Sequence, residues 1–178
     1  MPSPVGHALA GYVVGASIAG PTRTAADGSV PARVRYGPLL FAALACLPDI
    51  DFLFGTHATY THSVGAIMIV AAALALAFRP WRPLDGARGR LVLAGTLAYA
   101  SHPLLDWLGR DTSPPLGIMA LWPFSTEHFM SPVPLITPVS RRYWWPNFWS
   151  HNLKVVTVEI LVFGSLALAV HRWRRPAS

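Results

Sequence analysis

The sequence predicts an all-α membrane protein with about five transmembrane helices. Hydrophobic residues make up 53% of the 178 residues and charged residues only 12%, whereas soluble domains carry roughly 25% charged residues. Five stretches are apolar over most of the roughly 20 residues that a membrane-spanning helix needs. The single cysteine rules out a disulfide framework and a cysteine-based zinc site. A chain of this length forms one domain, so we expect residues 1–178 to build a single membrane-embedded unit.

The five apolar stretches are residues 5–20, 37–54, 63–78, 91–108 and 155–171. The first could pass for a signal peptide, but no Lys or Arg precedes Arg23, so we expect a retained helix. The second begins at Gly37 and Pro38, a good helix start, and runs into Pro48, where we expect the helix to end or kink. The third and fifth are the clearest spans, and Glu159 is the only acidic group in the fifth.

A connection of 46 residues, 109–154, separates the last two stretches and carries seven prolines and four tryptophans. Loops this long are uncommon in compact domains and are usually functional. Its aromatic cluster between Tyr143 and Trp149 also suits the headgroup region of a membrane. Both interpretations agree with an interfacial segment that roofs a functional site.

Basic residues are distributed unequally between the two sides that five spans would create. Residues 21–36, 79–90 and 172–175 carry ten arginines, whereas the opposite side carries only Arg110, Arg141, Arg142 and Lys154. The positive-inside rule then places the N-terminus outside and the C-terminus in the cytoplasm. Because the arginines flank apolar spans, they are better explained as topology anchors than as a nucleic-acid surface. We therefore expect membrane lipids as partners and no nucleic acid.

Ionisable side chains other than arginine gather on the arginine-poor side. They comprise His7, Asp49, Asp51, His57, His62, His102, Asp106, Asp111, Glu127, His128 and His151. His102 and Asp106 are four residues apart, so on a helix their side chains share one face. Asp49 and Asp51 can approach one site from a turn after the proline. Asp27 and Asp85 lie in arginine-rich loops and Glu159 is alone in its span, so we place none of these three in the cluster.

Carboxylates buried close together near hydrocarbon repel each other unless a proton or a cation neutralises them. Imidazole and carboxylate ligands without thiolate suit zinc, manganese or iron, of which we favour zinc and manganese. The number of candidate ligands is compatible with one ion or with two ions roughly 3.5–4 Å apart. Such an ion lowers the pKa of a bound water and polarises a substrate oxygen, so hydrolysis is the expected chemistry.

Single polar residues at helix ends are usually caps or interfacial groups. We apply that interpretation to His57, His128 and His151 when each is taken alone. Asp49, Asp51, His62, His102 and Asp106, taken together, favour a site because ionisable residues at membrane depth are costly. Glu127 and His128 are candidate catalytic residues that would act as general acid or base. Arg110, Arg141 or Arg142 would hold an anionic head group.

Five short motifs in order resemble a known family. They are Pro4-Val5-Gly6-His7 with Ala10-Gly11, Leu47-Pro48-Asp49-Ile50-Asp51, Thr61-His62-Ser63, Ser101-His102-Pro103-Leu104-Leu105-Asp106 and Leu121-Trp122-Pro123-Phe124. The chain is similar to the YdjM-like inner-membrane proteins, LexA-binding by name, which are described as membrane-bound metal-dependent hydrolases. The resemblance implies a multi-span membrane protein whose metal ligands are His7, Asp49, Asp51, His62, His102 and Asp106.

The sequence thus predicts a membrane-bound metal-dependent hydrolase with its site at the extracytoplasmic face. A site at that depth favours an amphipathic substrate, such as a lipid or lipid-linked phosphoester. Two alternatives stay open. The same ligands would serve an ion or proton transporter or a metal-handling protein, or a structural metal would hold helices together in a non-catalytic protein. The sequence identifies neither the substrate nor the oligomeric state.

Overall fold

The protein is all-α in its computed structural model, which describes residues 1–20, 32–79, 88–112 and 114–175. The helices are α1 (Pro4–Ala19), α2 (Ala32–Cys46), η1 (Leu47–Phe54), η2 (Tyr60–His62), α3 (Val64–Ala77), α4 (Arg88–Leu108), α5 (Phe148–Glu159), η4 (Ile160–Gly164) and α6 (Ser165–Arg174). The elements α5, η4 and α6 run on as one rod, and η4 is a turn of π-helix within it. The predicted set of five long helices is therefore present.

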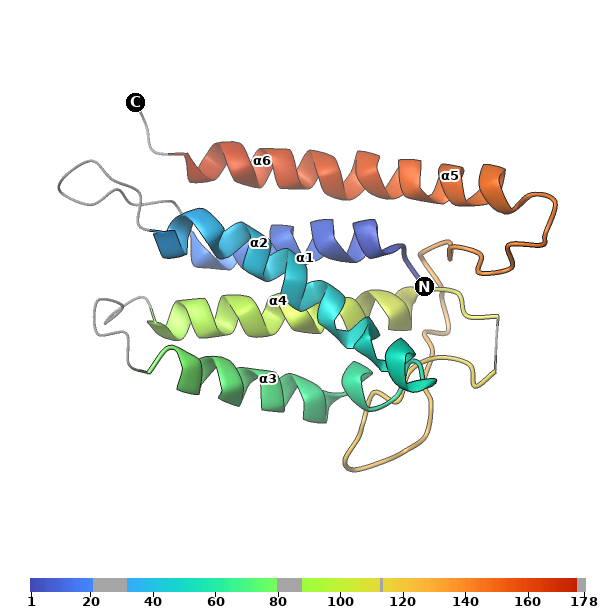
Figure 1. The fold of residues 1–178 in the computed structure, drawn as a ribbon, viewed down its shortest axis with the longest axis horizontal. Coiled ribbons are helices and arrows are strands. Elements are labelled where there is room, and N and C mark those ends of the chain that lie inside the picture. Colours follow the sequence, from blue (N-terminus) through green and yellow to red (C-terminus); the bar gives the residue numbers. More distant parts are fainter. Residues whose placement is uncertain (21–31, 80–87, 113, 176–178) are drawn as a thin grey trace.

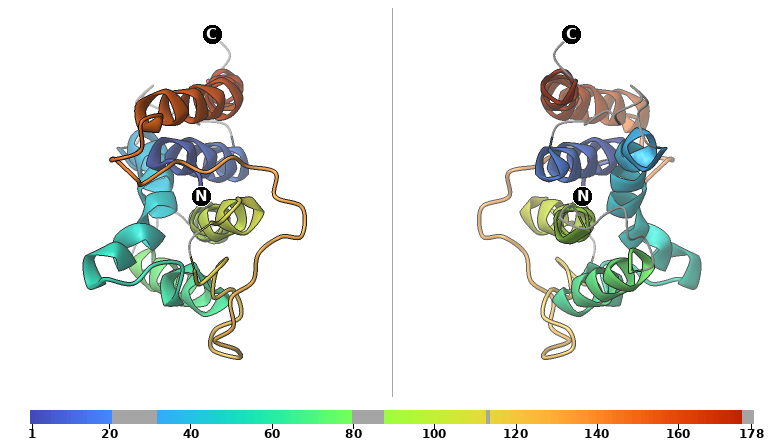
Figure 2. Two further views of the ribbon diagram at one scale, coloured as in Figure 1. Left: turned by 90° about the vertical axis from the view of Figure 1, so that its right-hand side faces the viewer. Right: turned by 90° about the vertical axis from the view of Figure 1, so that its left-hand side faces the viewer.

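Helix α1 occupies the middle of the bundle (Figure 1). It packs against α2, against α4 and against the α5–α6 rod, while α3 packs on the far side of α4. The end views of Figure 2 show the order rod, α1, α4, α3, with α2 crossing beside α1 and α4. Apart from α2, which runs obliquely, the helices lie roughly along one axis, so their ends form two opposite faces of the molecule (Figure 1).

Each end of α1 is set by its own sequence. Ser3 caps the first turn, since its hydroxyl oxygen accepts a hydrogen bond from the N–H of Gly6, and Pro4 occupies the first helical position. The helix stops at Gly20, whose φ of 74° is a left-handed value that few other residues adopt. Within it, Gly11 has no room for a side chain, because a Cβ there would overlap that of Ala45 on α2.

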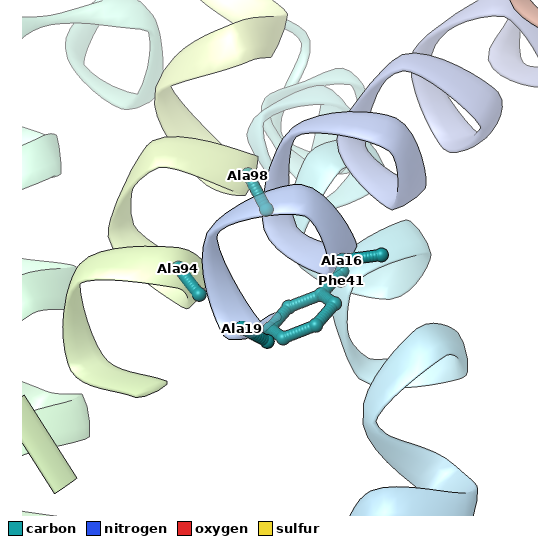
Figure 3. Close-up of a cluster of buried hydrophobic side chains, with 5 residues drawn as sticks. All are labelled: Ala16, Ala19, Phe41, Ala94 and Ala98. Carbon is teal, nitrogen blue, oxygen red and sulfur yellow. The ribbon is translucent and has the colours of Figure 1, made fainter. Parts of the chain in front are cut away.

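Small side chains let three helices approach closely in the apolar core. The core is formed by Ala16 and Ala19 of α1, Phe41 of α2, and Ala94 and Ala98 of α4 (Figure 3). Phe41 is the only large side chain among the five and is 2% exposed. The ring faces Gly15, where a Cβ would overlap it. Close packing of this kind stabilises helix pairs in a membrane, where hydrophobic burial adds little.

Two boundaries differ from those expected. Helix α2 begins at Ala32 rather than Gly37, so Pro38 lies inside it, where it removes one backbone hydrogen bond without ending the helix. The expected break near Pro48 is confirmed. Helix α2 ends at Cys46, and the chain then forms the 3₁₀-helix η1, which contains Pro48. The last rod begins at Phe148, so the connection after α4 is shorter than the predicted 109–154 and its final aromatic residues are helical.

Two helical stretches of the described residues are long and apolar enough to cross a membrane, Gly37–Phe54 and Phe148–Arg174. Pro4–Ala19 and Val64–Ala77 are apolar but shorter, and α4 carries Arg88, Arg90 and Asp106 within its 21 residues. The number of helices thus agrees with the sequence prediction, whereas length and composition support two spans directly. A spanning role for α1, α3 and α4 stays a prediction.

Candidate metal centre

Four helical elements bring their polar residues to the same end of the bundle. The first turns of α1, the 3₁₀-helices η1 and η2, and the last turns of α4 meet near the N-terminus (Figure 1). Helix α1 contributes His7, and η1 contributes Asp49 and Asp51. The 3₁₀-helix η2 contributes His62, and α4 contributes His102 and Asp106. These are the six ligands that the family resemblance implied. His57, which lies between η1 and η2, joins them.

A first triad consists of His7, His102 and Asp106, all buried, with ligand atoms within 4.8 Å of one another. His7 Nε2 lies 3.3 Å from Asp106 Oδ1, and His102 Nε2 lies 3.2 Å from Asp106 Oδ2. The two imidazole rings stack with their centroids 3.6 Å apart. His102 and Asp106 share one face of α4, as their spacing predicts, and α1 supplies the third side chain.

A second triad consists of Asp49, His57 and His62, whose ligand atoms also lie within 4.8 Å of one another. Asp49 Oδ1 lies 3.8 Å from His57 Nδ1 and 3.9 Å from His62 Nε2. This triad is more open than the first, because the Asp49 side chain is 26% exposed. A short stretch of chain, from η1 to η2, provides all three side chains.

The two triads touch. His62 Nε2 lies 3.1 Å from His102 Nε2 and 3.3 Å from Asp106 Oδ2. Asp49 Oδ1 lies 3.5 Å from His102 Nε2. The ligand atoms of both groups therefore form one contiguous cluster.

The donor set fits a divalent metal ion. Both oxygens of Asp106 are fully buried, make no hydrogen bond of good geometry within the described residues and lie within 3.3 Å of three imidazole nitrogens, so a bound metal ion or a protonated histidine has to compensate the charge of this carboxylate. His102 donates its Nδ1–H to the carbonyl oxygen of Ala45 at 2.6 Å. That bond leaves the Nε2 lone pair directed at the cluster, which is the usual arrangement of a metal-binding histidine.

Asp51 lies behind the histidines rather than in either triad. Its Oδ1 is 3.4 Å from His57 Nδ1, its Oδ2 is 3.3 Å from His62 Nδ1, and it accepts a hydrogen bond from Thr61. A carboxylate in this position orients imidazole ligands and increases their basicity. Burial lowers the pKa of His62, but the carboxylates of Asp106 and Asp51 outweigh it and raise that pKa above its ordinary value.

A cavity of about 620 Å³ opens onto the cluster. His7, Asp49 and His57 form part of its wall, so both triads are accessible from it. Its other walls include the N-terminal residues Met1, Pro2 and Pro4, the cationic side chains of Arg110, Arg141 and Arg142, and the rings of Phe52, Trp144 and Trp145. The segment between α4 and α5, which was predicted to roof the site, supplies these arginines and tryptophans.

The two candidate acid–base residues lie elsewhere. Glu127 is exposed, and His128 is half-buried with an Nε2 that has no hydrogen-bond partner in the described residues. Neither residue lines the cavity. The structure thus brings together the six predicted ligands without these two, and the general acid or base role of Glu127 and His128 stays a prediction.

The family model described as "YdjM inner membrane protein" matches residues 1–177. The chain belongs to the YdjM inner membrane protein family. The inner membrane protein YbcI of Escherichia coli (strain K12) is 28% identical over 191 residues, which cover 98% of this chain and 99% of that protein. No solved structure matches the chain. The family resemblance drawn from the five motifs is therefore confirmed.

Membership in the YdjM family makes this an inner membrane protein, as the family resemblance implied and in agreement with its apolar composition. Neither the family description nor the name of YbcI states a reaction, so the chemistry of the YdjM-family site follows from its own residues. Sequence reasoning listed His57 among the gathered polar side chains but interpreted it as a cap or interfacial group rather than as a ligand. Its position in the loop between two predicted ligands, Asp51 and His62, was the available signal, but loop conformation decides whether such a side chain turns inward.

Proposed function

We propose that this YdjM-family protein is a membrane-bound metal-dependent hydrolase that acts on a phosphoester or lipid-type substrate at the extracytoplasmic face. The observation that carries the proposal is the shared cavity: one wall offers His7, Asp49 and His57, and another offers three arginines. A structural metal site would be enclosed, whereas this one adjoins a space large enough for a small-molecule ligand.

The residues of the cavity have separate tasks in this proposal. His7, His102, Asp106, Asp49, His57 and His62 hold one or two divalent ions, with zinc or manganese as the favoured metals. A bound ion supplies a water of lowered pKa and polarises the phosphoryl oxygen. Asp51 keeps His57 and His62 in orientation.

The arginines account for the charge of the substrate. Arg110, Arg141 and Arg142 line the cavity, and none of their guanidinium groups forms an ion pair with a carboxylate of the described residues. Guanidinium groups bind phosphate oxygens through paired hydrogen bonds. The nearby rings of Trp144 and Trp145 suit the headgroup level of a bilayer, so a lipid tail can stay in the hydrocarbon while the head group reaches the ligands.

Elemental analysis of the detergent-purified protein tests the site, beside a variant with Asp49→Ala and Asp51→Ala. We expect stoichiometric zinc or manganese in the parent and a reduced content in the variant, which keeps the first triad but loses the carboxylate of the second, together with metal-dependent hydrolysis of a phosphoester by the parent only. Glu127→Gln is the matched control for metal content, because it removes a carboxylate outside the cluster. A well-folded parent that binds neither metal after reloading would overturn the proposal in favour of a proton relay.

The orientation of the protein in the membrane needs a separate test. The arginine distribution places the last residue in the cytoplasm and the cluster at the outer face. A reporter fused after residue 178 should therefore be active only in its cytoplasmic form. An external signal would contradict a five-span topology and the extracytoplasmic placement of the site.

A further inference from the structure

Glu159 is a buried carboxylate in the middle of the long apolar rod. It is 4% exposed and pairs with no Lys, Arg or His side chain of the described residues. Instead it contacts the start of α1, 156 residues away in the chain: Ser3 donates its backbone N–H to Oε1 at 2.9 Å and its hydroxyl to Oε2. Glu159 stays outside the metal cluster, as expected, but the fold gives it a partner that no local sequence pattern indicates.

The contact is closely fitted. Ser3 is 3% exposed, and its hydroxyl oxygen also accepts the N–H of Gly6, so carboxylate, cap and first turn form one hydrogen-bonded unit. Gly6 leaves the space that the carboxylate fills, because a Cβ at this position would lie 2.8 Å from Glu159 Cδ. A negative charge at a helix N-terminus is also favoured by the helix dipole.

The unit leads directly to the cavity. His7 donates its backbone N–H to the carbonyl oxygen of Ser3 at 3.0 Å, so a displacement of Ser3 moves the histidine of the first triad. Met1, Pro2 and Pro4 line the cavity on either side of Ser3. Val139 of the roofing segment donates to the carbonyl oxygen of Met1 at 3.0 Å. The first residues of the chain are thus held between the rod and the roof.

We propose that Glu159 is a positioning residue that docks the α5–α6 rod onto the first turn of α1 and so fixes His7 and the N-terminal wall of the cavity. The docking stands on the contacts alone. Its consequence for metal binding rests on the proposed function, so the experiment needs a readout that requires neither metal nor substrate.

Cys46 provides that readout. It is the only cysteine of the chain, and its Sγ lies 3.6 Å from the carbonyl oxygen of Pro4. The rate at which N-ethylmaleimide alkylates Cys46 in the metal-free protein therefore reports release of the first turn of α1. We expect Glu159→Ala and Ser3→Ala to raise this rate about tenfold, equivalent to ~1.4 kcal/mol. Glu159→Gln retains one acceptor oxygen and should restore part of the protection.

Two controls on the same rod make the test specific. Thr157→Ala changes an exposed polar residue and should leave the alkylation rate at the parent value. Val155→Ala removes buried apolar volume without touching the carboxylate, and its effect should be clearly smaller than that of Glu159→Ala. An unchanged rate in Glu159→Ala, or an equal rise in Val155→Ala, would overturn the docking role, since the second result means general loosening.

Cobalt titration then links the contact to the site. In Glu159→Ala the affinity for Co²⁺ should fall as it does in His7→Ala, whereas in Thr157→Ala it should not change. If the parent binds no metal, the proposed hydrolase function is wrong. The Cys46 alkylation rates would then still decide whether Glu159 docks the rod onto α1. Normal metal binding and hydrolysis by the parent, with the same Cys46 alkylation rate in Glu159→Ala as in the parent, would end the docking role alone.

Discussion

At one end of the bundle the buried faces of the central helices form an apolar core, and at the other end the same faces carry the charged cluster. On α4, Ala94, Ala98, His102 and Asp106 follow one another at intervals of four residues and are all buried, so one face changes from apolar to charged within three turns. At the apolar end it packs on Ala16, Ala19 and Phe41 (Figure 3). At the polar end it meets His7 and the 3₁₀-helices.

The comparison shows how a membrane protein can enclose charge. Alanines and glycines bring α1, α2 and α4 together by steric fit, and the same close approach then excludes water from Asp106. Packing of the helices should therefore be enough to stabilise the apolar end, whereas the stability of the polar end should depend on the cation that neutralises its buried carboxylates. Three predictions test this division, from the largest expected effect to the smallest.

Filling the apolar contact should have the largest effect. Gly11→Leu places a side chain where even a Cβ would overlap Ala45, and overpacking of this kind costs about 3 kcal/mol. Thermal unfolding of the metal-free protein in detergent measures the loss. Ser17→Leu adds the same side chain at an exposed position of α1 and should unfold close to the parent. Equal stability of the two variants would mean that close helix approach does not hold this end together.

Removing metal should destabilise the polar end by a smaller amount. At a free ion concentration about a hundredfold above Kd, binding stabilises the folded state by about 2.7 kcal/mol. Chelation should therefore lower the unfolding temperature of the parent. Asp106→Ala should show no response to chelation or to added metal, because it removes the carboxylate shared by three histidines. A full metal response in this variant would exclude Asp106 as a ligand.

Removing a support should weaken the site less than removing a ligand. Asp51→Asn leaves both triads intact but loses the charge behind His57 and His62, and the loss of such outer groups lowers metal affinity about 10–100-fold. His102→Ala should abolish binding at the first triad. Metal titration by calorimetry compares the two variants. If Asp51→Asn abolishes binding as His102→Ala does, then Asp51 coordinates the ion directly.

Local sequence features predicted the helices and part of the site. Apolar runs located each helix, Pro48 ended α2, and the four-residue spacing placed His102 and Asp106 on one face. These properties depend on neighbouring residues, so a single sequence contains them. The boundary at Phe148 was misplaced because aromatic residues suit both an interfacial loop and the first turn of a helix.

Contacts between segments that are distant in the chain could not be predicted from the sequence. Whether His57 turns inward depends on the path of the chain between η1 and η2, and the partner of Glu159 is a serine at the other end of the sequence. The cavity is likewise a product of assembly, since the arginines of the 109–147 segment meet the histidines only after α4 and α5 are in place. The residue types indicated a metal-binding cluster, whereas tertiary packing decides which side chains belong to it.

The π-helical turn η4 sets the phase of the rod. Val155 and Glu159 are buried before it, and Ala167 and Arg174 are buried after it. At 100° per residue a regular helix would turn residues 166 and 173 toward the same side as Glu159, yet Leu166 and Trp173 are 48% and 56% exposed. The extra residue of a π-turn supplies the missing rotation. Deleting one residue within Ile160–Gly164 would therefore turn the rod into a regular helix and keep Ala167 and Arg174 on the seam with α1, whereas straightening the turn without a deletion would bring Leu166 and Trp173 there.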